Sequence, residues 1–174
     1  MLELKAGERH PIKFTLDGVE VRGFAEPRML LSDFLRHELG RTEIHIACEQ
    51  GVCGTCTIML DGNPARSCLT FAVQAIGRRV ETVRSLSPAD GKLNDLQESF
   101  RRHHGLQCGY CTPGILVSSE AFLRENAKPS EKEVREMLSG HICRCTGYAG
   151  MVDAILETAE KRATTAASLG PTNQ

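Results

Sequence analysis

The chain has 174 residues, 41% of them hydrophobic and 25% charged, and a formal net charge of −1. These values are typical of a globular protein with one domain or two small ones, and they lack the basic excess of a nucleic-acid-binding protein. The first residues lack the apolar core of a signal peptide, and no apolar run approaches the length of a membrane span. We therefore expect a cytoplasmic protein, in which grouped cysteines stay reduced and indicate metal binding or catalysis.

The first third of the chain predicts a β-hairpin and a helix. Apolar and polar residues alternate on both sides of Asp17-Gly18, which favours a hairpin over residues 10–23 closed by a type I′ turn. Apolar residues at helical spacing between residues 29 and 39 predict a short amphipathic helix, and Gly40 is suited to end it.

A second hairpin follows. Residues 56–60 predict a strand, Asp61-Gly62 a second tight turn, and residues 65–69 the partner strand, which would carry the fourth cysteine of the first group. Residues 79–83 predict another strand. Two hairpins, one helix and a cysteine-rich loop give a β-grasp arrangement of the plant-type ferredoxin kind, and we expect this domain to occupy residues 1–84.

The loop before the second hairpin holds the first group of cysteines. Their spacing, Cys-x4-Cys-x2-Cys with a fourth cysteine after eleven further residues, is that of plant-type [2Fe–2S] ferredoxins: Cys48, Cys53, Cys56 and Cys68. Gly51 and Gly54 permit the backbone conformations that a loop curling around sulfide ions requires. Zinc or disulfides remain alternatives, although structural zinc sites usually show two short Cys-x2–4-Cys pairs.

The composition changes at residues 85–91, which are rich in Ser, Pro, Asp and Gly and predict a domain boundary. The pattern beyond is helical. A first helix is expected to run to about His104, with Leu93, Leu96 and Phe100 on one face. Thr112 and Pro113 then predict an N-cap and a first helical residue.

Two more helices complete the second half. Ser130 and Glu133 form a capping box that opens a helix ending at Gly140. A last helix is expected to follow Gly150 and to face inward with Val152, Ile155, Leu156 and Ala159. We expect an all-α four-helix bundle over residues 85–163, and a polar, mobile tail over residues 164–174. The predicted fold class of the whole chain is α+β, with the β-grasp domain first.

The second group of cysteines lies in the loops of this helical half, at Cys108, Cys111, Cys143 and Cys145. Because two helices enter and two leave, both loops should reach the same end of the bundle, where four sulfurs could converge. The first pair precedes a helix N-terminus, which favours a thiolate. Zinc is a stronger alternative here, although a Cys-x-Cys pair is rare in structural zinc sites.

Three motifs resemble the small iron–sulfur subunit of the molybdenum hydroxylases, the xanthine oxidase family. They are Cys48-Glu-Gln-Gly-Val-Cys-Gly-Thr-Cys56, Gln107-Cys-Gly-Tyr-Cys-Thr-Pro-Gly114 and Ile142-Cys-Arg-Cys-Thr-Gly-Tyr148. The resemblance covers roughly residues 11–161. One departure is Ala47, where the family usually has glycine.

The resemblance implies that each half binds one [2Fe–2S] cluster through its four cysteines. It implies electron transfer from a molybdenum pterin cofactor through the helical-domain cluster and the ferredoxin-type cluster to FAD. The molybdenum site and the FAD would belong to a large and a medium subunit, in a dimer of heterotrimers. It also implies that Gln107 and Cys145 lie next to the pterin, while substrate is bound on another subunit and this chain has no catalytic residue.

Other interpretations follow from the same residues. A free-standing ferredoxin-like carrier would leave the helical half unexplained, and a zinc-dependent interaction module would use the same cysteines. Glu49 and Gln50 are interpreted as solvated loop residues, and Tyr110 and Tyr148 as packing residues with a hydroxyl at the surface. Histidine could replace cysteine as a ligand, as in Rieske centres, but eight cysteines already supply all the ligands that two clusters need. We therefore do not expect a ligand among the histidines near the cysteine groups: His45, His103, His104 and His141.

Overall fold

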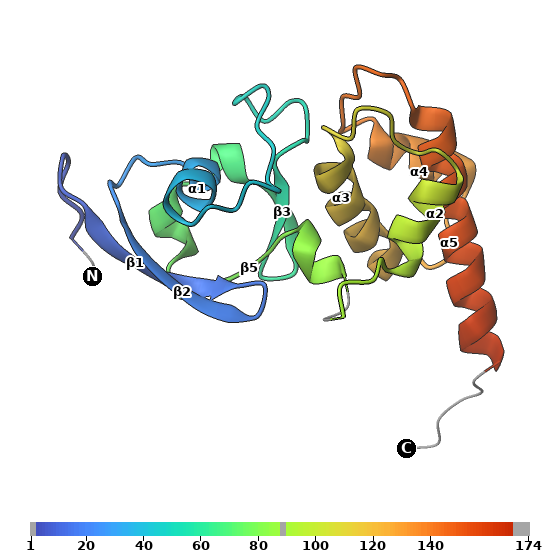
Figure 1. Ribbon diagram of the computed structural model, residues 1–174, viewed down its shortest axis with the longest axis horizontal. Helices are drawn as coiled ribbons and strands as arrows, with labels where there is room; N and C mark the ends of the chain where they lie inside the picture. Colours follow the sequence, from blue (N-terminus) through green and yellow to red (C-terminus); the bar gives the residue numbers. More distant parts are fainter. Residues whose placement is uncertain (1–2, 88–89, 169–174) are drawn as a thin grey trace.

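The computed structural model describes residues 3–87 and 90–168, which form a sheet-containing half and a helical half packed side by side (Figure 1). The first half holds a five-stranded mixed sheet in the order β2-β1-β5-β3-β4. Its strands are β1 His10–Leu16, β2 Val19–Ala25, β3 Thr57–Leu60, β4 Asn63–Arg66 and β5 Arg79–Glu81. The pair β1·β5 is parallel, and β1·β2, β3·β4 and β3·β5 are antiparallel.

Both predicted tight turns are present, and their backbone explains the sequence. Asp17 and Gly18 have φ values of 49° and 82°, and Asp61 and Gly62 have 51° and 85°. Two successive residues with positive φ are the requirement of a type I′ turn, which Asp-Gly meets at low cost. The hairpin turns therefore fix the register of both strand pairs.

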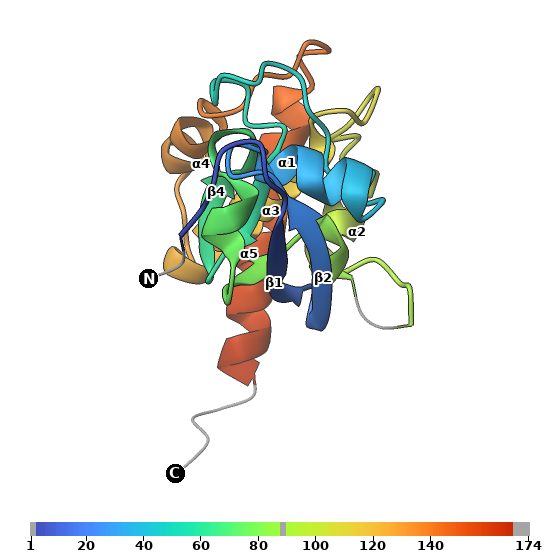
Figure 2. The same ribbon diagram turned by 90° about the vertical axis from the view of Figure 1, so that its left-hand side faces the viewer.

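The helix predicted over residues 29–39 is shorter and less regular than expected. It consists of α1 Leu31–Asp33 and a π-helical turn Phe34–Glu38, and Gly40 follows with a φ of 65°. Figure 2 shows α1 lying against the sheet. Its side chains enter a core built from both hairpins, in which Phe14 and Phe34 pack with ring centroids 5.9 Å apart.

Two other expectations for the first half need correction. Cys68 lies on a 3-10 turn, Ser67–Leu69, because β4 ends at Arg66. The strand expected over residues 79–83 ends at Glu81, and a 3-10 turn, Val83–Leu86, begins two residues later. Strands β4 and β5 therefore end earlier than the sequence predicts, and a 3-10 turn follows each of them. A further 3-10 turn spans Ala72–Ala75.

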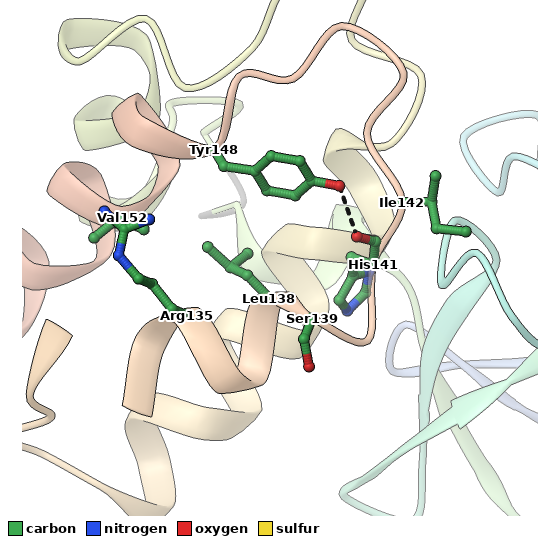
Figure 3. A pocket seen from close by; sticks show the side chains of 7 residues that line it. All are labelled: Arg135, Leu138, Ser139, His141, Ile142, Tyr148 and Val152. Atoms are coloured by element: carbon green, nitrogen blue, oxygen red, sulfur yellow. Dashed lines mark hydrogen bonds between the residues drawn. The ribbon is translucent and has the colours of Figure 1, made fainter. Parts of the chain in front are cut away.

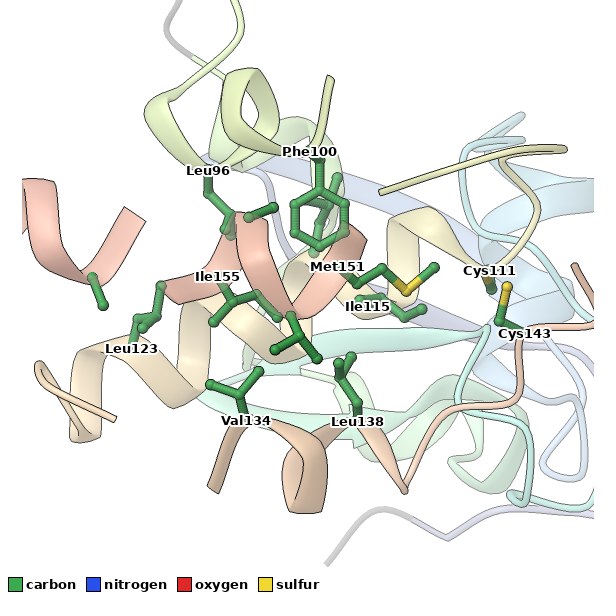
Figure 4. Packing of buried hydrophobic residues seen from close by; sticks show 14 residues of the cluster. Leu96, Phe100, Cys111, Ile115, Leu123, Val134, Leu138, Cys143, Met151 and Ile155 are labelled. Carbon is green, nitrogen blue, oxygen red and sulfur yellow. The ribbon is translucent and has the colours of Figure 1, made fainter. Parts of the chain in front are cut away.

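The helical half contains α2 Asp95–Arg102, α3 Thr112–Glu125, α4 Glu131–Leu138 and α5 Tyr148–Ser168. Their apolar faces enclose one core, shown in Figure 4. The capping box of Ser130 and Glu133 is present, as is an unpredicted one of Asn94 and Gln97. Within residues 3–87 and 90–168, no helix is long and apolar enough to cross a membrane.

The helical half also departs from the predictions in four places. Leu93 precedes α2 and is 42% exposed, because the capping box at Asn94 starts the helix after it. Thr112 is the first residue of α3, and Cys111 takes the cap position. The last helix begins before Gly150, at Tyr148, and Leu156 is only partly buried. Residues 164–168, expected in the tail, are helical, and residues 169–174 lie outside the described residues.

A small third cluster joins the two halves. Met59 of β3 packs against Val117 and Ala121 of α3, with Val83 and Leu86 at its edge. Burial of apolar side chains is the main favourable term in such packing. At the start of α3, Gly114 packs against Gly54 and Thr55 of the cysteine loop.

Candidate metal centres

The first four cysteines form two neighbouring pairs: three lie on the loop before β3, and Cys68 lies on the turn after β4. The thiol of Cys53 lies beside that of Cys48, and the thiol of Cys56 lies beside that of Cys68. The charge of Cys48 also acts on Cys68, so the two pairs are neighbours. Two adjoining pairs of thiols suit a binuclear centre, in which each of two irons takes two thiolates.

Backbone N–H groups of the loop point at the outermost sulfur. Gln50 N and Cys53 N each lie 3.4 Å from Cys48 Sγ. These two N–H groups, Gln50 first, lower the pKa of Cys48 to about 6. Hydrogen bonds to the charged form of a group favour that form, so the loop is built to hold a thiolate, which is the metal-binding form of cysteine.

The glycines of the loop are required by space as well as by conformation. Gly51 and Gly54 have φ values of 76° and 75°. A Cβ atom on Gly54 would lie 2.7 Å from Gly140 O and closer still to His141 Nδ1. The loop therefore passes directly against the helical half, with no room for a side chain at this point.

The second four cysteines also meet in two pairs, at one end of the helical half. Cys108 lies beside Cys145, and Cys111 lies beside Cys143; Figure 4 shows the latter pair. Cys111 and Cys143 are buried, Cys145 is partly buried and Cys108 is exposed. The loops α2–α3 and α4–α5 thus bring together residues that are up to 37 positions apart in the sequence.

Burial raises the pKa of two inner cysteines, whereas hydrogen bonds lower the pKa of Cys48. It is the main cause that raises the pKa of Cys68 and of Cys111 to about 12, and the neighbouring thiols Cys56 and Cys143 add to it. Coordination to a metal cation deprotonates a thiol outright and offsets this cost. Paired thiols of this kind suit the two irons of a [2Fe–2S] cluster.

The two groups of cysteines are joined directly by the backbone. Ile142 N donates a hydrogen bond of 2.9 Å to Cys53 O, and Ile142 immediately precedes Cys143. Beside this contact, Arg66 of β4 donates to Gly140 O at 2.8 Å. Gly114 of α3 packs against the loop so closely that a Cβ atom there would lie 2.6 Å from Thr55 O. The backbone segments that carry Cys53 and Cys143 therefore meet at one tight interface.

Tyr148 supports the loop that carries the last two cysteines. Its hydroxyl donates to His141 O at 3.0 Å, the bond drawn in Figure 3, and accepts from Cys143 N at 2.7 Å. Tyr148 and His141 border a cavity of about 360 Å³ between α4 and α5. The hydroxyl is therefore part of the loop's hydrogen bonding, where the sequence suggested a surface group.

The other residues singled out by the sequence take simpler positions. Gln107 is exposed, and its side-chain amide donates to Cys145 O at 3.1 Å, so it links the two cysteine loops of the helical half. Glu49 and Gln50 are exposed loop residues. Three of the four histidines are bonded elsewhere: His45 to Tyr110 O, His103 to Glu157 and His141 to Ser118.

Sequence reasoning missed two features of the centres. Glu49 and Thr146, each next to a cysteine, have φ values of 52° and 58°, and such conformations in non-glycine residues often mark functional loops. The second feature is Arg66, which spans from Thr57 Oγ1 to Gly140 O. Neither has a local sequence signal, and the contact of Arg66 depends on how the two halves pack.

Two family models match the chain in succession. Residues 14–79 match a 2Fe-2S iron-sulfur cluster binding domain, and residues 82–156 match a [2Fe-2S] binding domain. The caffeine dehydrogenase subunit gamma of Pseudomonas sp. (strain CBB1) is 49% identical over 149 residues, which are 84% of this chain and 89% of the relative. The chain is a small iron–sulfur subunit of the molybdenum hydroxylase family.

Further relatives of this iron–sulfur subunit agree. The nicotine 6-hydroxylase small subunit of Paenarthrobacter nicotinovorans is 50% identical over 144 residues, covering 80% of this chain and 86% of the relative. In the crystal structure of quinoline 2-oxidoreductase from Pseudomonas putida 86, one chain is 52% identical and superposes with a TM-score of 0.85, covering 90% of this chain and 97% of that one. The subunit therefore consists of a ferredoxin-like iron–sulfur domain and a helical iron–sulfur domain, and it is part of an oxidoreductase.

Proposed function

We propose that this iron–sulfur subunit conducts electrons from a molybdenum-containing large subunit to an FAD-containing medium subunit, in a cytoplasmic dimer of heterotrimers. The proposal assigns residues 1–84 to a β-grasp domain and residues 85–163 to a four-helix bundle. Bound [2Fe–2S] clusters supply one-electron chemistry, which the chain's own side chains cannot perform. Electrons would reach the helical domain first and the ferredoxin-like domain second.

The observation that carries the proposal is the arrangement of the two cysteine groups. We assign Cys48, Cys53, Cys56 and Cys68 to one cluster and Cys108, Cys111, Cys143 and Cys145 to the other. The inner ligand Cys53 is bonded through its carbonyl oxygen to Ile142 N, while the outer ligand Cys108 is exposed and Cys48 is partly exposed. Two sites whose loops are joined by a backbone hydrogen bond, each with at least one cysteine accessible to solvent, suit a relay between two partners.

Exposed apolar side chains lie close in sequence to the cysteines of both groups. Val52, Leu69 and Phe71 are 61%, 61% and 43% exposed near the first cysteine group. Near the second group, Leu106, Tyr110 and Ile142 are 40%, 48% and 52% exposed. Exposed apolar residues that cluster around a functional site mark protein interfaces. We assign the second surface to the large subunit and the first to the medium subunit.

Gln107 and Cys145 lie at the second surface, where we place the pterin of the large subunit. The amide of Gln107 donates to Cys145 O, which leaves its carbonyl oxygen as an acceptor for an N–H edge. Gln107 would then have two roles: its carbonyl oxygen would contact the pterin, and its amide nitrogen links the two cysteine loops of the helical half. A pterin ring, which has both hydrogen-bond donors and acceptors, fits the side-chain amide of Gln107.

The named relatives suggest the substrate class. Caffeine, nicotine and quinoline, which appear in the names of these relatives, are all N-heterocycles. We propose an N-heteroaromatic substrate for the assembled enzyme, bound on the large subunit.

Purification of the tagged chain from its native host tests the proposal. We expect two larger subunits to co-purify with molybdenum and FAD, and anaerobic addition of an N-heteroaromatic substrate to reduce both clusters, as seen by EPR. A stable monomer that has both clusters but no partner would instead favour the free-standing carrier.

A further inference from the structure

Tyr110 connects the two cysteine loops through residues other than those of the inner interface. It lies in the short loop between Cys108 and Cys111, and its phenol reaches the other half of the chain. The hydroxyl donates a hydrogen bond of 2.6 Å to Ile46 O, two residues before Cys48. One side chain of the helical half is thereby bound to the backbone that leads into the first cysteine group.

A second residue completes the connection. The main-chain carbonyl of Tyr110 lies 2.7 Å from Nδ1 of His45. Because a carbonyl oxygen only accepts, this contact requires the proton on Nδ1. The two rings are also stacked, with centroids 4.5 Å apart and planes inclined by 15°. Three contacts of different kinds thus hold the same two segments, and hydroxyl, carbonyl and ring each have a partner.

The position of these contacts distinguishes them from the rest of the interface. Ile142 and Arg66 hold the inner side, at Cys53 and Gly140, and apolar packing joins β3 to α3. The Tyr110 contacts instead lie next to Cys48 and Cys108, the most exposed ligand of each group. Loops held only at their inner side would be free to move at these outer ligands.

We propose that Tyr110 and His45 form a clasp that fixes the separation of the two cysteine groups. They are positioning residues, since they act on the cysteine loops and touch no reacting atom. The inference rests on the proposed electron-transfer function, because electron exchange between two centres depends steeply on their separation. The clasp itself involves only residues of this chain, and its effect on the cysteine loops can be measured without enzyme turnover.

Tyr110→Phe is the decisive variant, because it keeps the stacked ring and removes the hydroxyl. Tyr148→Phe is the matched control, since its hydroxyl bonds only within the helical half, to His141 and Cys143. In the assembled complex, hydrogen–deuterium exchange should increase about fivefold in the segment around Ile46 for Tyr110→Phe, as expected for the loss of one hydrogen bond between neutral groups. The control should leave that segment unchanged.

EPR supplies the second measurement. With both clusters reduced, the magnetic interaction between them should weaken in Tyr110→Phe, or the EPR splitting that it causes should broaden. Iron content should stay at the parent level. His45→Phe, which keeps a ring but lacks Nδ1–H, should have the same effect. Parent-like exchange, or increased exchange with an unchanged magnetic interaction, would overturn the clasp. A complex that shows the interaction but is not reduced by substrate would count against the proposed function and leave the clasp supported.

Discussion

Gly114→Ala tests how tightly the two halves of the iron–sulfur subunit are packed. Gly114 lies in the first turn of α3, away from the left-handed region. Helix propensity alone favours alanine over glycine by about 1 kcal/mol. A Cβ atom there would lie 2.6 Å from Thr55 O, however, and closer still to Gly54 O. Both obstacles are backbone atoms of the cysteine loop, so neither can rotate away.

The clash should outweigh the propensity. Overpacking typically costs about 1–3 kcal/mol, and two backbone contacts below van der Waals distance place this site at the upper end. With the propensity gain subtracted, the net destabilisation is about 2 kcal/mol. For a chain of this size, that lowers the melting temperature by about 4–8 °C. Iron bound by the first cysteine group should also decrease, because the loop must move.

Thermal melting of the purified subunit, followed by circular dichroism and by visible absorption, measures this effect. Gly140→Ala is the control: it also lies at the interface, but its Cβ atom would make only ordinary contacts at 3.5 Å and its backbone is not left-handed. It should melt within a degree or two of the parent. If Gly114→Ala melts at or above the parent temperature, the close approach of α3 to the cysteine loop is wrong.

Three further variants test separate parts of the account. Cys53→Ser should abolish the ferredoxin-type EPR signal and keep that of the helical domain, since each half has its own ligands; loss of both would show that the sites depend on each other. Burial, aided by the charge of Arg66, lowers the pKa of His141 to about 4. The unfolded chain therefore takes up a proton below about pH 6.5 that the folded chain refuses, and the parent should lose about 2 kcal/mol between pH 7 and pH 5. His141→Gln should remove this dependence in melting curves, and an equal loss in parent and variant would contradict it. Gln107→Ala should keep iron content and slow cluster reduction by substrate in stopped-flow experiments, by about tenfold or less for one lost hydrogen bond; an unchanged rate with full cofactor would make Gln107 a loop residue only.

Local signals in the sequence predicted local structure well. The Asp-Gly turns at residues 17 and 61 were predicted because two positive φ values in succession suit few other residue pairs. The capping box at Ser130 was predicted for a similar reason, since its two hydrogen bonds involve residues three apart. The spacing of the cysteines indicated two four-ligand sites, and in the structure the cysteines of each group lie in pairs.

Features that depend on packing could not be predicted in this way. The parallel pairing of β1 with β5 joins strands about 65 residues apart. The 3-10 turn that carries Cys68 and the early start of α5 at Tyr148 follow from how the loops must meet. The bonds of Tyr110 to Ile46 and of Ile142 to Cys53 link the two halves. Such contacts leave no periodic pattern in the sequence, because each of them joins one residue of the first half to one residue of the second half.

Metal analysis of the purified subunit tests the central claim most directly. If both cysteine groups hold [2Fe–2S] clusters, each chain should contain about four irons and four acid-labile sulfides. Removal of the metals should release both in equal amounts and bleach the visible absorption. Stoichiometric zinc, or iron near two per chain, would contradict the account of two iron–sulfur centres joined in one electron-transfer subunit.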